Sequence, residues 1–277
     1  EYNYLNTFQN IITKYNTYAN VYNKSALFDF KKARYNYKKS LQLGLEYNNS
    51  TYISVNYFNL GELYLKKKHD SALYYIDKSL KYAQTDSLTI LNCFVNKALY
   101  HSNKGKHDLA INAIQKALSY RVNTDSTNWK SEVGYKNLES AKDKAYVLET
   151  LIKKVDILNR AYKDNNDKSL LETALKTVKS ADQLIDIIQN NSFEKNSKLL
   201  WRKEASKLYA KGVQSALLLN DPVSAFYYME RNKALLLTEN IINNTAQFNL
   251  PKTVLNKSIS LKKQVLELES SFKKEND

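Results

Sequence analysis

Apolar and polar positions recur along most of this chain with the period of an α-helix. The clearest stretch runs from Asn59 to Ala83, where two short amphipathic segments flank a polar turn. Small residues stand where the two segments would cross, at Gly61, Ala72 and Ser79, because closely spaced helix axes leave no room for branched side chains. One such helical hairpin cannot bury its own apolar faces, so the stretch predicts neighbouring hairpins.

The same small–large–small pattern returns at a nearly constant spacing. Ala33, Ala72 and Ala110 lie 39 and 38 residues apart. The large and small residues that follow them are Tyr37 and Ser40, Ile76 and Ser79, and Ile114 and Ala117. A fixed period over three units is typical of repeat proteins. The pattern resembles the tetratricopeptide repeat (TPR), in which a Leu-Gly pair, an aromatic residue, an Ala and a second small residue follow one another at nearly this spacing.

The resemblance and the composition together predict the fold class. The chain of 277 residues has only five Gly and two Pro, which favours an all-α protein. We expect a right-handed TPR-type helical-hairpin solenoid with irregular, longer helices in its second half. Residues 1–120 would form three TPR-like hairpins, residues 121–137 a loop, residues 138–249 two longer hairpins, and residues 250–277 a terminal helix.

Local signals place several boundaries within this scheme. Asp86 and the pair Asp221–Pro222 are typical of helix starts, and the run Asp164–Asp167 is a break. Ser169–Glu172 has the spacing of a capping box. In the polar loop, Trp129 is interpreted as an apolar plug against the neighbouring helices.

The terminal helix has a seam of apolar residues at alternating spacings of four and three, as in a coiled coil. The seam residues that we single out are Val254, Leu261, Val265, Leu268 and Phe272. Such a seam needs a partner, which would be an attached domain, the preceding stretch Ala225–Ile242 of this chain, or a second copy of the chain. A homodimer through this helix therefore stays open.

The second half carries a further resemblance. The segment Leu170–Ile241, and most specifically Ala225–Ile241, is similar to the helical region that precedes the peptidase domain of bacterial TPR–CHAT proteins. That family has the pattern Ala-Phe-x-x-x-Glu-(Lys/Arg)-x-Lys-Ala-x-x-Leu-Leu-Glu, from which Thr238 departs, and Leu250–Pro251 matches the usual entry into the CHAT region. The resemblance implies a regulatory, protein-binding module of a caspase-like cysteine peptidase, whose catalytic His–Cys pair would follow this chain. The chain itself would then not be an enzyme.

The charge of the chain leaves two other functions open. Lys and Arg number 42 against 28 Asp and Glu, a net charge of +14, but only five of the cations are Arg. Proteins that bind nucleic acids rely on Arg for bidentate contacts, so a solvated Lys-rich surface is the simpler interpretation. A Lys-rich nucleic-acid scaffold, and the sensor region of a signalling kinase with a coiled-coil linker, remain alternatives.

Residues with reactive side chains are few. Cys93 and His101 lie eight positions apart, about 12 Å along one helix, too far for a nucleophile and its base. Cys93 is interpreted as a core residue, and His69 and His107 as solvated or capping residues in turns. We therefore expect no catalytic residue, cofactor or metal site.

The chain contains no apolar run of the length that a membrane span needs. It begins at Glu1 without a signal-like segment, so we expect a piece of a longer cytoplasmic protein, cut at one or both ends.

The surface expected to act is the concave groove that first helices line in TPR proteins. The TPR resemblance implies a protein or peptide ligand there, and the CHAT resemblance adds an attached or docked CHAT domain as a partner. The matching groove residues here are Phe58, Glu62, Leu65, Lys66, Val95, Leu99, Ser102 and Asn103. Asn59 with Lys66, and Asn96 with Asn103, are also similar to the clamp by which some TPRs hold a terminal carboxylate.

Overall fold

The computed structural model describes the backbone of residues 2–84, 86–191 and 195–248, and seven helical residues between 254 and 267. Every regular element within the continuous ranges is a helix, which confirms the all-α prediction. The elements, in chain order, are α1 Tyr2–Asn23, the short 3₁₀ helix η1 Ser25–Leu27, α2 Phe30–Glu46, α3 Ser50–Lys66, α4 Ser71–Tyr82, α5 Ser87–Asn103, α6 His107–Ser119, α7 Tyr135–Glu139, α8 Lys144–Asn165, α9 Lys168–Asn191, α10 Lys195–Leu218 and α11 Pro222–Phe248.

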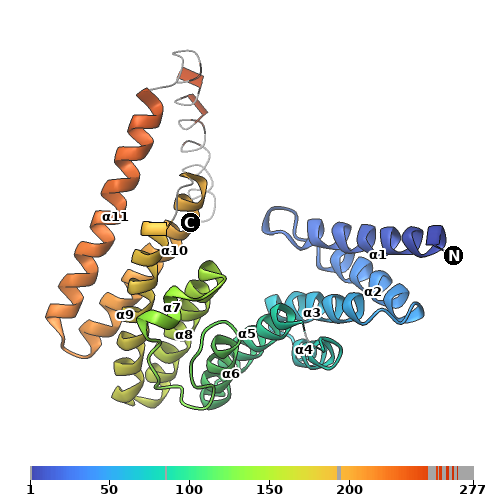
Figure 1. Cartoon of the computed structure of the whole chain (residues 1–277), viewed down its shortest axis with the longest axis horizontal. Coiled ribbons are helices and arrows are strands. Elements are labelled where there is room, and N and C mark those ends of the chain that lie inside the picture. Colours follow the sequence, from blue (N-terminus) through green and yellow to red (C-terminus); the bar gives the residue numbers. More distant parts are fainter. Residues whose placement is uncertain are drawn as a thin grey trace. The chain divides into compact units, whose positions relative to one another are not determined.

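Consecutive helices pack in antiparallel pairs (Figure 1). The pairs α1/α2, α3/α4, α5/α6 and α8/α9 form the most extensive contacts. The second helix of each pair also packs against the first helix of the next, through α2/α3, α4/α5, α6/α8 and α9/α10. In addition, the first helices of successive pairs contact one another, from α3 to α5, from α5 to α8 and from α8 to α10.

Small residues allow the two helices of a pair to approach closely, as the sequence predicts. Ala33, Ala72 and Ala110 are each completely buried. A Cβ atom placed on Gly61 would lie only 2.9 Å from the Ile76 side chain and 3.3 Å from its backbone nitrogen. The repeated small residues therefore mark the helix crossings.

Six of the described helices end in a residue with a left-handed backbone conformation. Positive φ angles occur at Asn48, Lys68, Gln84, Gly105, Asn166 and Asn220, after α2, α3, α4, α5, α8 and α10. At four of these ends a backbone N–H reaches back to the carbonyl of the last helical turn, for example from His69 to Tyr64 (3.0 Å) and from Asp221 to Ala216 (2.9 Å). These are Schellman-type ends, which satisfy carbonyls that the helix leaves unpaired.

The predicted helix starts are mostly confirmed. Asp86 accepts hydrogen bonds from the backbone of Leu88 and Thr89, and Asp221 accepts one from Ser224 at the start of α11. The capping box at Ser169–Glu172 is wrong. The cap is Asp167, which accepts both the backbone N–H and the hydroxyl of Ser169, because a carboxylate immediately before the helix is the stronger acceptor.

The polar stretch after α6 forms a loop and one short helix, α7, which crosses the predicted boundary at residue 137. The helix expected from residue 138 begins only at Lys144. The buried residues between α6 and α8 are Val122, Val133, Leu138 and Ala141, while Trp129 is partly buried with the Lys130 ammonium over its ring. Aliphatic residues thus fill the interior of this stretch, and the interpretation of Trp129 as an apolar plug stays a prediction.

Polar contacts join the helices of the second half. Asp182 on α9 is buried and accepts hydrogen bonds from Tyr209 of α10 (2.6 Å) and Tyr227 of α11 (2.7 Å). Ser215 of α10 donates to Asn159 of α8 (2.9 Å). These contacts hold α10 and the start of α11 against the α8/α9 pair.

By their internal contacts the residues divide into two units, Glu1–Tyr228 and Met229–Asp277. The boundary falls within α11. In α11 the small–large–small pattern Ala225, Met229 and Asn232 predicts a buried Met229, but Tyr228 is the buried residue and Met229 is exposed.

The terminal seam is described only in part. Val254 and Leu261 are helical and exposed, and Val265, Leu268 and Phe272 lie outside the described residues. Among the described helices, none is both long and apolar enough to cross a membrane.

Candidate functional site

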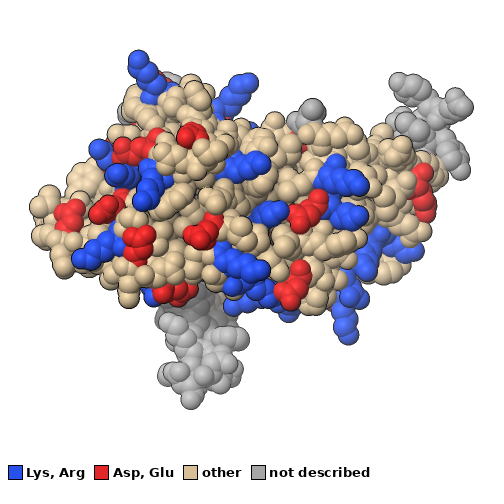
Figure 2. Space-filling model, turned by 90° about the horizontal axis from the view of Figure 1, so that it is seen from below, with Lys and Arg blue, Asp and Glu red and all other residues tan. Residues whose placement is uncertain are grey.

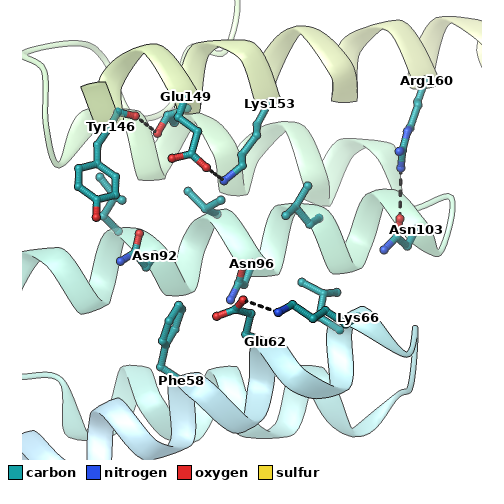
Figure 3. A pocket seen from close by; sticks show the side chains of 15 residues that line it. Phe58, Glu62, Lys66, Asn92, Asn96, Asn103, Tyr146, Glu149, Lys153 and Arg160 are labelled. Atoms are coloured by element: carbon teal, nitrogen blue, oxygen red, sulfur yellow. Dashed lines mark hydrogen bonds and ion pairs between the residues drawn. The ribbon is translucent and has the colours of Figure 1, made fainter. Parts of the chain in front are cut away.

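A pocket of about 450 Å³ lies between α3, α5 and α8, the first helices of three successive pairs (Figure 3). Each helix presents one face to it, with residues spaced three or four positions apart. The lining residues are Phe58, Glu62, Leu65 and Lys66 of α3, Leu91, Asn92, Val95, Asn96, Leu99 and Asn103 of α5, and Tyr146, Glu149, Thr150, Lys153 and Arg160 of α8. We call this pocket the groove.

The structure brings together seven of the eight predicted groove residues. The seven are Phe58, Glu62, Leu65, Lys66, Val95, Leu99 and Asn103. Ser102 is the exception, because it is buried and its hydroxyl has no hydrogen-bond partner. The face of α5 that lines the groove passes through Asn92, Asn96 and Asn103 instead. That the groove binds a partner stays a prediction.

The wall formed by α8 was missed from the sequence. The irregular stretch after α6 breaks the repeat period, so no register could be carried onto α8. The available signal was the spacing of Tyr146, Glu149, Lys153 and Arg160, which lie on one helix face at intervals of three, four and seven.

Two ion pairs within single helices neutralise most of the charge in the groove. Lys66 lies 3.3 Å from Glu62, and Lys153 lies 2.6 Å from Glu149. The fifth charged residue, Arg160, donates a hydrogen bond to the side-chain oxygen of Asn103 (3.2 Å). Arg160 and Asn103 are both exposed.

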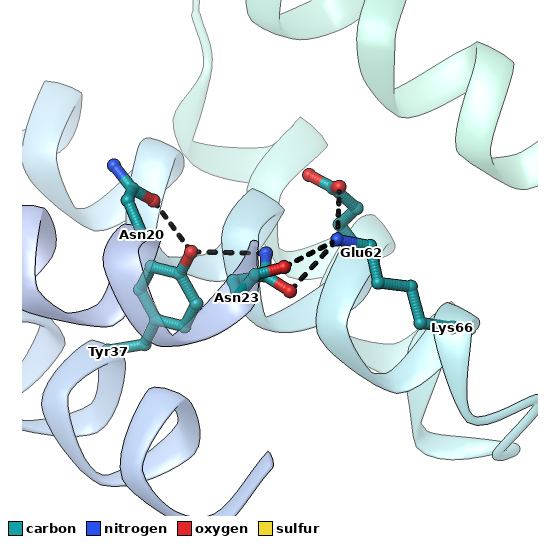
Figure 4. Close-up of polar contacts among 5 residues, drawn as sticks. All are labelled: Asn20, Asn23, Tyr37, Glu62 and Lys66. Carbon is teal, nitrogen blue, oxygen red and sulfur yellow. Dashed lines mark hydrogen bonds and ion pairs between the residues drawn. The ribbon is translucent and has the colours of Figure 1, made fainter. Parts of the chain in front are cut away.

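Lys66 also has a structural role (Figure 4). Its ammonium donates to the backbone carbonyl (3.2 Å) and to the side-chain oxygen (2.9 Å) of Asn23, the last residue of α1. The Asn23 amide in turn donates to the hydroxyl of Tyr37, which donates to Asn20. Burial raises the pKa of Tyr37 to about 12. Lys66 therefore caps the C-terminus of α1.

Because of these contacts, the ammonium of Lys66 in α3 is not free to hold a terminal carboxylate, as the clamp would require. Lys66 already has three acceptors, and the amide of Asn59 donates to Asn16 (3.4 Å). The amide nitrogen of Asn96 is different, because it is buried and has no hydrogen-bond partner. The floor between these polar groups is apolar and includes Phe58, Leu91 and Leu99.

The reactive side chains lie apart from the groove lining. Cys93 is completely buried and its thiol donates to Ser79 (3.2 Å), while burial raises its pKa to about 11. The complete burial of the side chain confirms Cys93 as a core residue. Burial also lowers the pKa of His101.

The interpretation of the turn histidines was half right. His69 caps α4 by accepting the backbone N–H of Ser71 (3.1 Å). His107 is buried, and its Nε2 lies 2.6 Å from a carboxylate oxygen of Asp164, so the solvated role predicted for it is wrong. The sequence could not show this contact because it joins residues 57 positions apart.

Basic residues are mixed with acidic ones on the face shown in Figure 2. Among the residues coloured there, Lys and Arg form no continuous band. Several cations lie over aromatic rings, such as Lys116 over Phe94 (4.8 Å) and Lys32 over Tyr22 (5.2 Å). This face is therefore typical of a solvated surface with mixed charge.

Neither metal chemistry nor known relatives define the site further. Within the described ranges, no three His, Cys, Asp or Glu side chains are placed to hold a metal ion. No protein-family model matches the chain, and no curated protein matches it significantly.

Proposed function

We propose that this chain is a protein-interaction module whose groove binds an extended segment of a partner protein. The observation that carries the proposal is the groove itself. Three successive helical hairpins contribute their first helices to one pocket, with an apolar floor and amide and charged groups around it. A concave site of this size and composition is the usual form of a binding site.

We further propose that the hairpins form a TPR-type right-handed solenoid. Two features support this. The buried small residues Ala33, Ala72 and Ala110 repeat at nearly constant spacing, and the first helices of successive pairs lie next to one another. In a solenoid each hairpin buries the apolar face of its neighbour, which explains why one hairpin alone would not be stable.

For the intact protein, we propose a regulatory role beside a caspase-like CHAT peptidase domain in the bacterial cytoplasm. The support is the sequence resemblance of Ala225–Ile241 to the region that precedes that domain. In this proposal the chain contributes no catalytic residue, and engagement of a partner in the groove changes the activity of the attached peptidase. The terminal helix would contact that domain.

The groove assignment can be tested with a displayed library of random peptides. Peptides selected on the wild-type chain are measured again with Leu99→Asp, a groove variant, and with Leu109→Asp, on the exposed part of α6. We expect Leu99→Asp to weaken binding at least tenfold and Leu109→Asp to have little effect. Equal affinities for all three proteins would show that the groove is not the binding site.

A further inference from the structure

One end of the groove carries a cation that no carboxylate neutralises. Among the described residues, Arg160 forms no ion pair, and its one hydrogen bond uses the side-chain oxygen of Asn103. A guanidinium has five N–H donors in a planar arrangement that fits a carboxylate. Among the described residues, the amide nitrogen of Asn103 also has no hydrogen-bond partner. The side chains of Arg160 and Asn103 can therefore both donate hydrogen bonds to a ligand.

The other two cations of the groove are already engaged. Lys66 is bound to Asn23 and Glu62, and Lys153 is paired with Glu149. An incoming anion would have to displace these contacts before it could use either ammonium. Arg160 is therefore the cation that an anionic group can reach without breaking an ion pair.

Helix C-termini at the Arg160 end of the groove weaken the positive potential of Arg160 without cancelling it. The C-termini of α3, α5 and α8 lie toward the Arg160 end and carry partial negative charge, about half an elementary charge each. Lys66 lies in the last turn of α3, and carbonyls at the end of α5 accept the N–H groups of Lys104 and Lys106. For a carboxylate bound to the guanidinium of Arg160, the full positive charge at hydrogen-bond distance therefore outweighs the partial negative charges of the helix ends.

The opposite end of the groove is aromatic. Figure 3 shows Phe58, Asn92 and Tyr146 toward one end, and Lys66, Asn103 and Arg160 toward the other. Asn92 and Asn103 lie eleven positions apart on α5, about 16 Å at about 1.5 Å per residue. An extended peptide needs about five residues at about 3.3 Å each to cover this length, and since its side chains alternate between two faces, two side chains that both enter the groove are six residues apart.

We propose that the groove selects an acidic, extended segment of a partner protein. In it, an internal Asp or Glu side chain binds Arg160 and Asn103, and a bulky apolar side chain six residues away packs between Phe58 and Tyr146. This inference rests on the proposed function. The net charge of +14 also favours association with an acidic partner over a basic one.

The probe is a terminally blocked nonapeptide with Phe at its second position, Glu at its eighth and Ser elsewhere. The comparison peptides carry Gln instead of Glu, or Glu at the fourth position. Dissociation constants are measured by calorimetric titration at low salt, where a charged contact is least screened. We expect the Glu peptide to bind at least tenfold more tightly than either comparison peptide.

Variants of the chain assign this preference to Arg160. Arg160→Gln should abolish the difference between the Glu and Gln peptides, and Arg160→Lys should restore only part of it. Lys163→Gln removes the same charge from the same helix outside the groove and should leave the difference unchanged. Arg160 and Lys163 are both exposed, so we expect their substitution to leave the fold intact. Equal midpoints of urea unfolding for the wild-type chain and all the variants will check this.

Each other outcome contradicts a defined part of the account. Equal binding of the Glu and Gln peptides would overturn the acidic preference and leave the groove function standing. A Glu preference that persists in Arg160→Gln would show that the acidic side chain binds elsewhere than at Arg160. Binding that needs a free C-terminal carboxylate would show that the groove holds the end of a chain and not an internal Asp or Glu side chain. If no displayed peptide can be selected either, the proposed function itself fails.

Discussion

Lys66, a residue of the groove, closes the C-terminus of the first helix by donating to both the backbone carbonyl and the side-chain oxygen of Asn23. These two residues are 43 positions apart, so the contact joins two successive hairpins. The same side chain thus lines the groove and fixes the hairpin that precedes it. A substitution at Lys66 alters stability as well as the surface available to a partner.

Lys66→Met should therefore destabilise the chain by about 1 kcal/mol, since hydrogen bonds from a half-exposed ammonium are lost. Hydrogen exchange should accelerate most in the last turn of α1. Lys38→Met, which removes an exposed charge from α2, is the control and should change neither quantity. Unchanged exchange in α1 would contradict the capping role of Lys66.

Gly61→Ala and Gly44→Ala should have opposite effects. The new methyl group at Gly61 would overlap the Ile76 side chain and press on its backbone, whereas at Gly44 its nearest neighbours are at an ordinary 3.5 Å. We expect Gly61→Ala to destabilise by about 1–3 kcal/mol through overpacking. Gly44→Ala should stabilise by up to about 1 kcal/mol through helix propensity. Urea unfolding measures both, and a stabilising Gly61→Ala would show that the crossing is looser than described.

Left-handed turn residues offer a second stability test. Lys68 and Gln84 have positive φ angles, which a side chain with a Cβ atom adopts at a cost of about 1 kcal/mol. Replacing either with Gly should raise the thermal midpoint, while Gly105→Ala should lower it by a similar amount. A fall in the midpoint for both Gly variants would show that these turns are not left-handed.

Lys154 should make stability depend on pH. Its side chain is completely buried, its ammonium donates to Gln115 (2.8 Å), and burial lowers its pKa to about 8. Because the pKa in the unfolded chain is higher, near 10.5, stability rises as the pH increases from about 8 to about 10.5 and is lowest below that range. The difference corresponds to about 3 kcal/mol as an upper bound.

Lys154→Met should remove this dependence and stabilise the chain at pH 7, less the cost of leaving Gln115 without its donor. Unfolding is measured at pH 7 and pH 10 for both proteins, so that other titrating groups cancel in the difference. An identical pH dependence in the two proteins would rule out Lys154 as its source.

Local sequence patterns predicted the helices and the crossings well, because each depends on residues within one hairpin. Ala72 and Ile76 are buried where their spacing required. Contacts between different hairpins could not be predicted from local sequence patterns. The capping of α1 by Lys66 and the pairing of His107 with Asp164 join distant positions, and the α8 wall of the groove follows a loop that breaks the repeat.

The most direct test of the central claim is photo-crosslinking from the groove. A benzophenone amino acid replaces Leu99 in the groove, or Leu109 outside it, and each protein is irradiated with a peptide selected on the wild-type chain. We predict efficient crosslinking from position 99, suppressed by an excess of unlabelled peptide, and none above background from position 109. Crosslinking from position 109 alone, with a peptide that still binds both proteins, would contradict the assignment of the groove as the binding site.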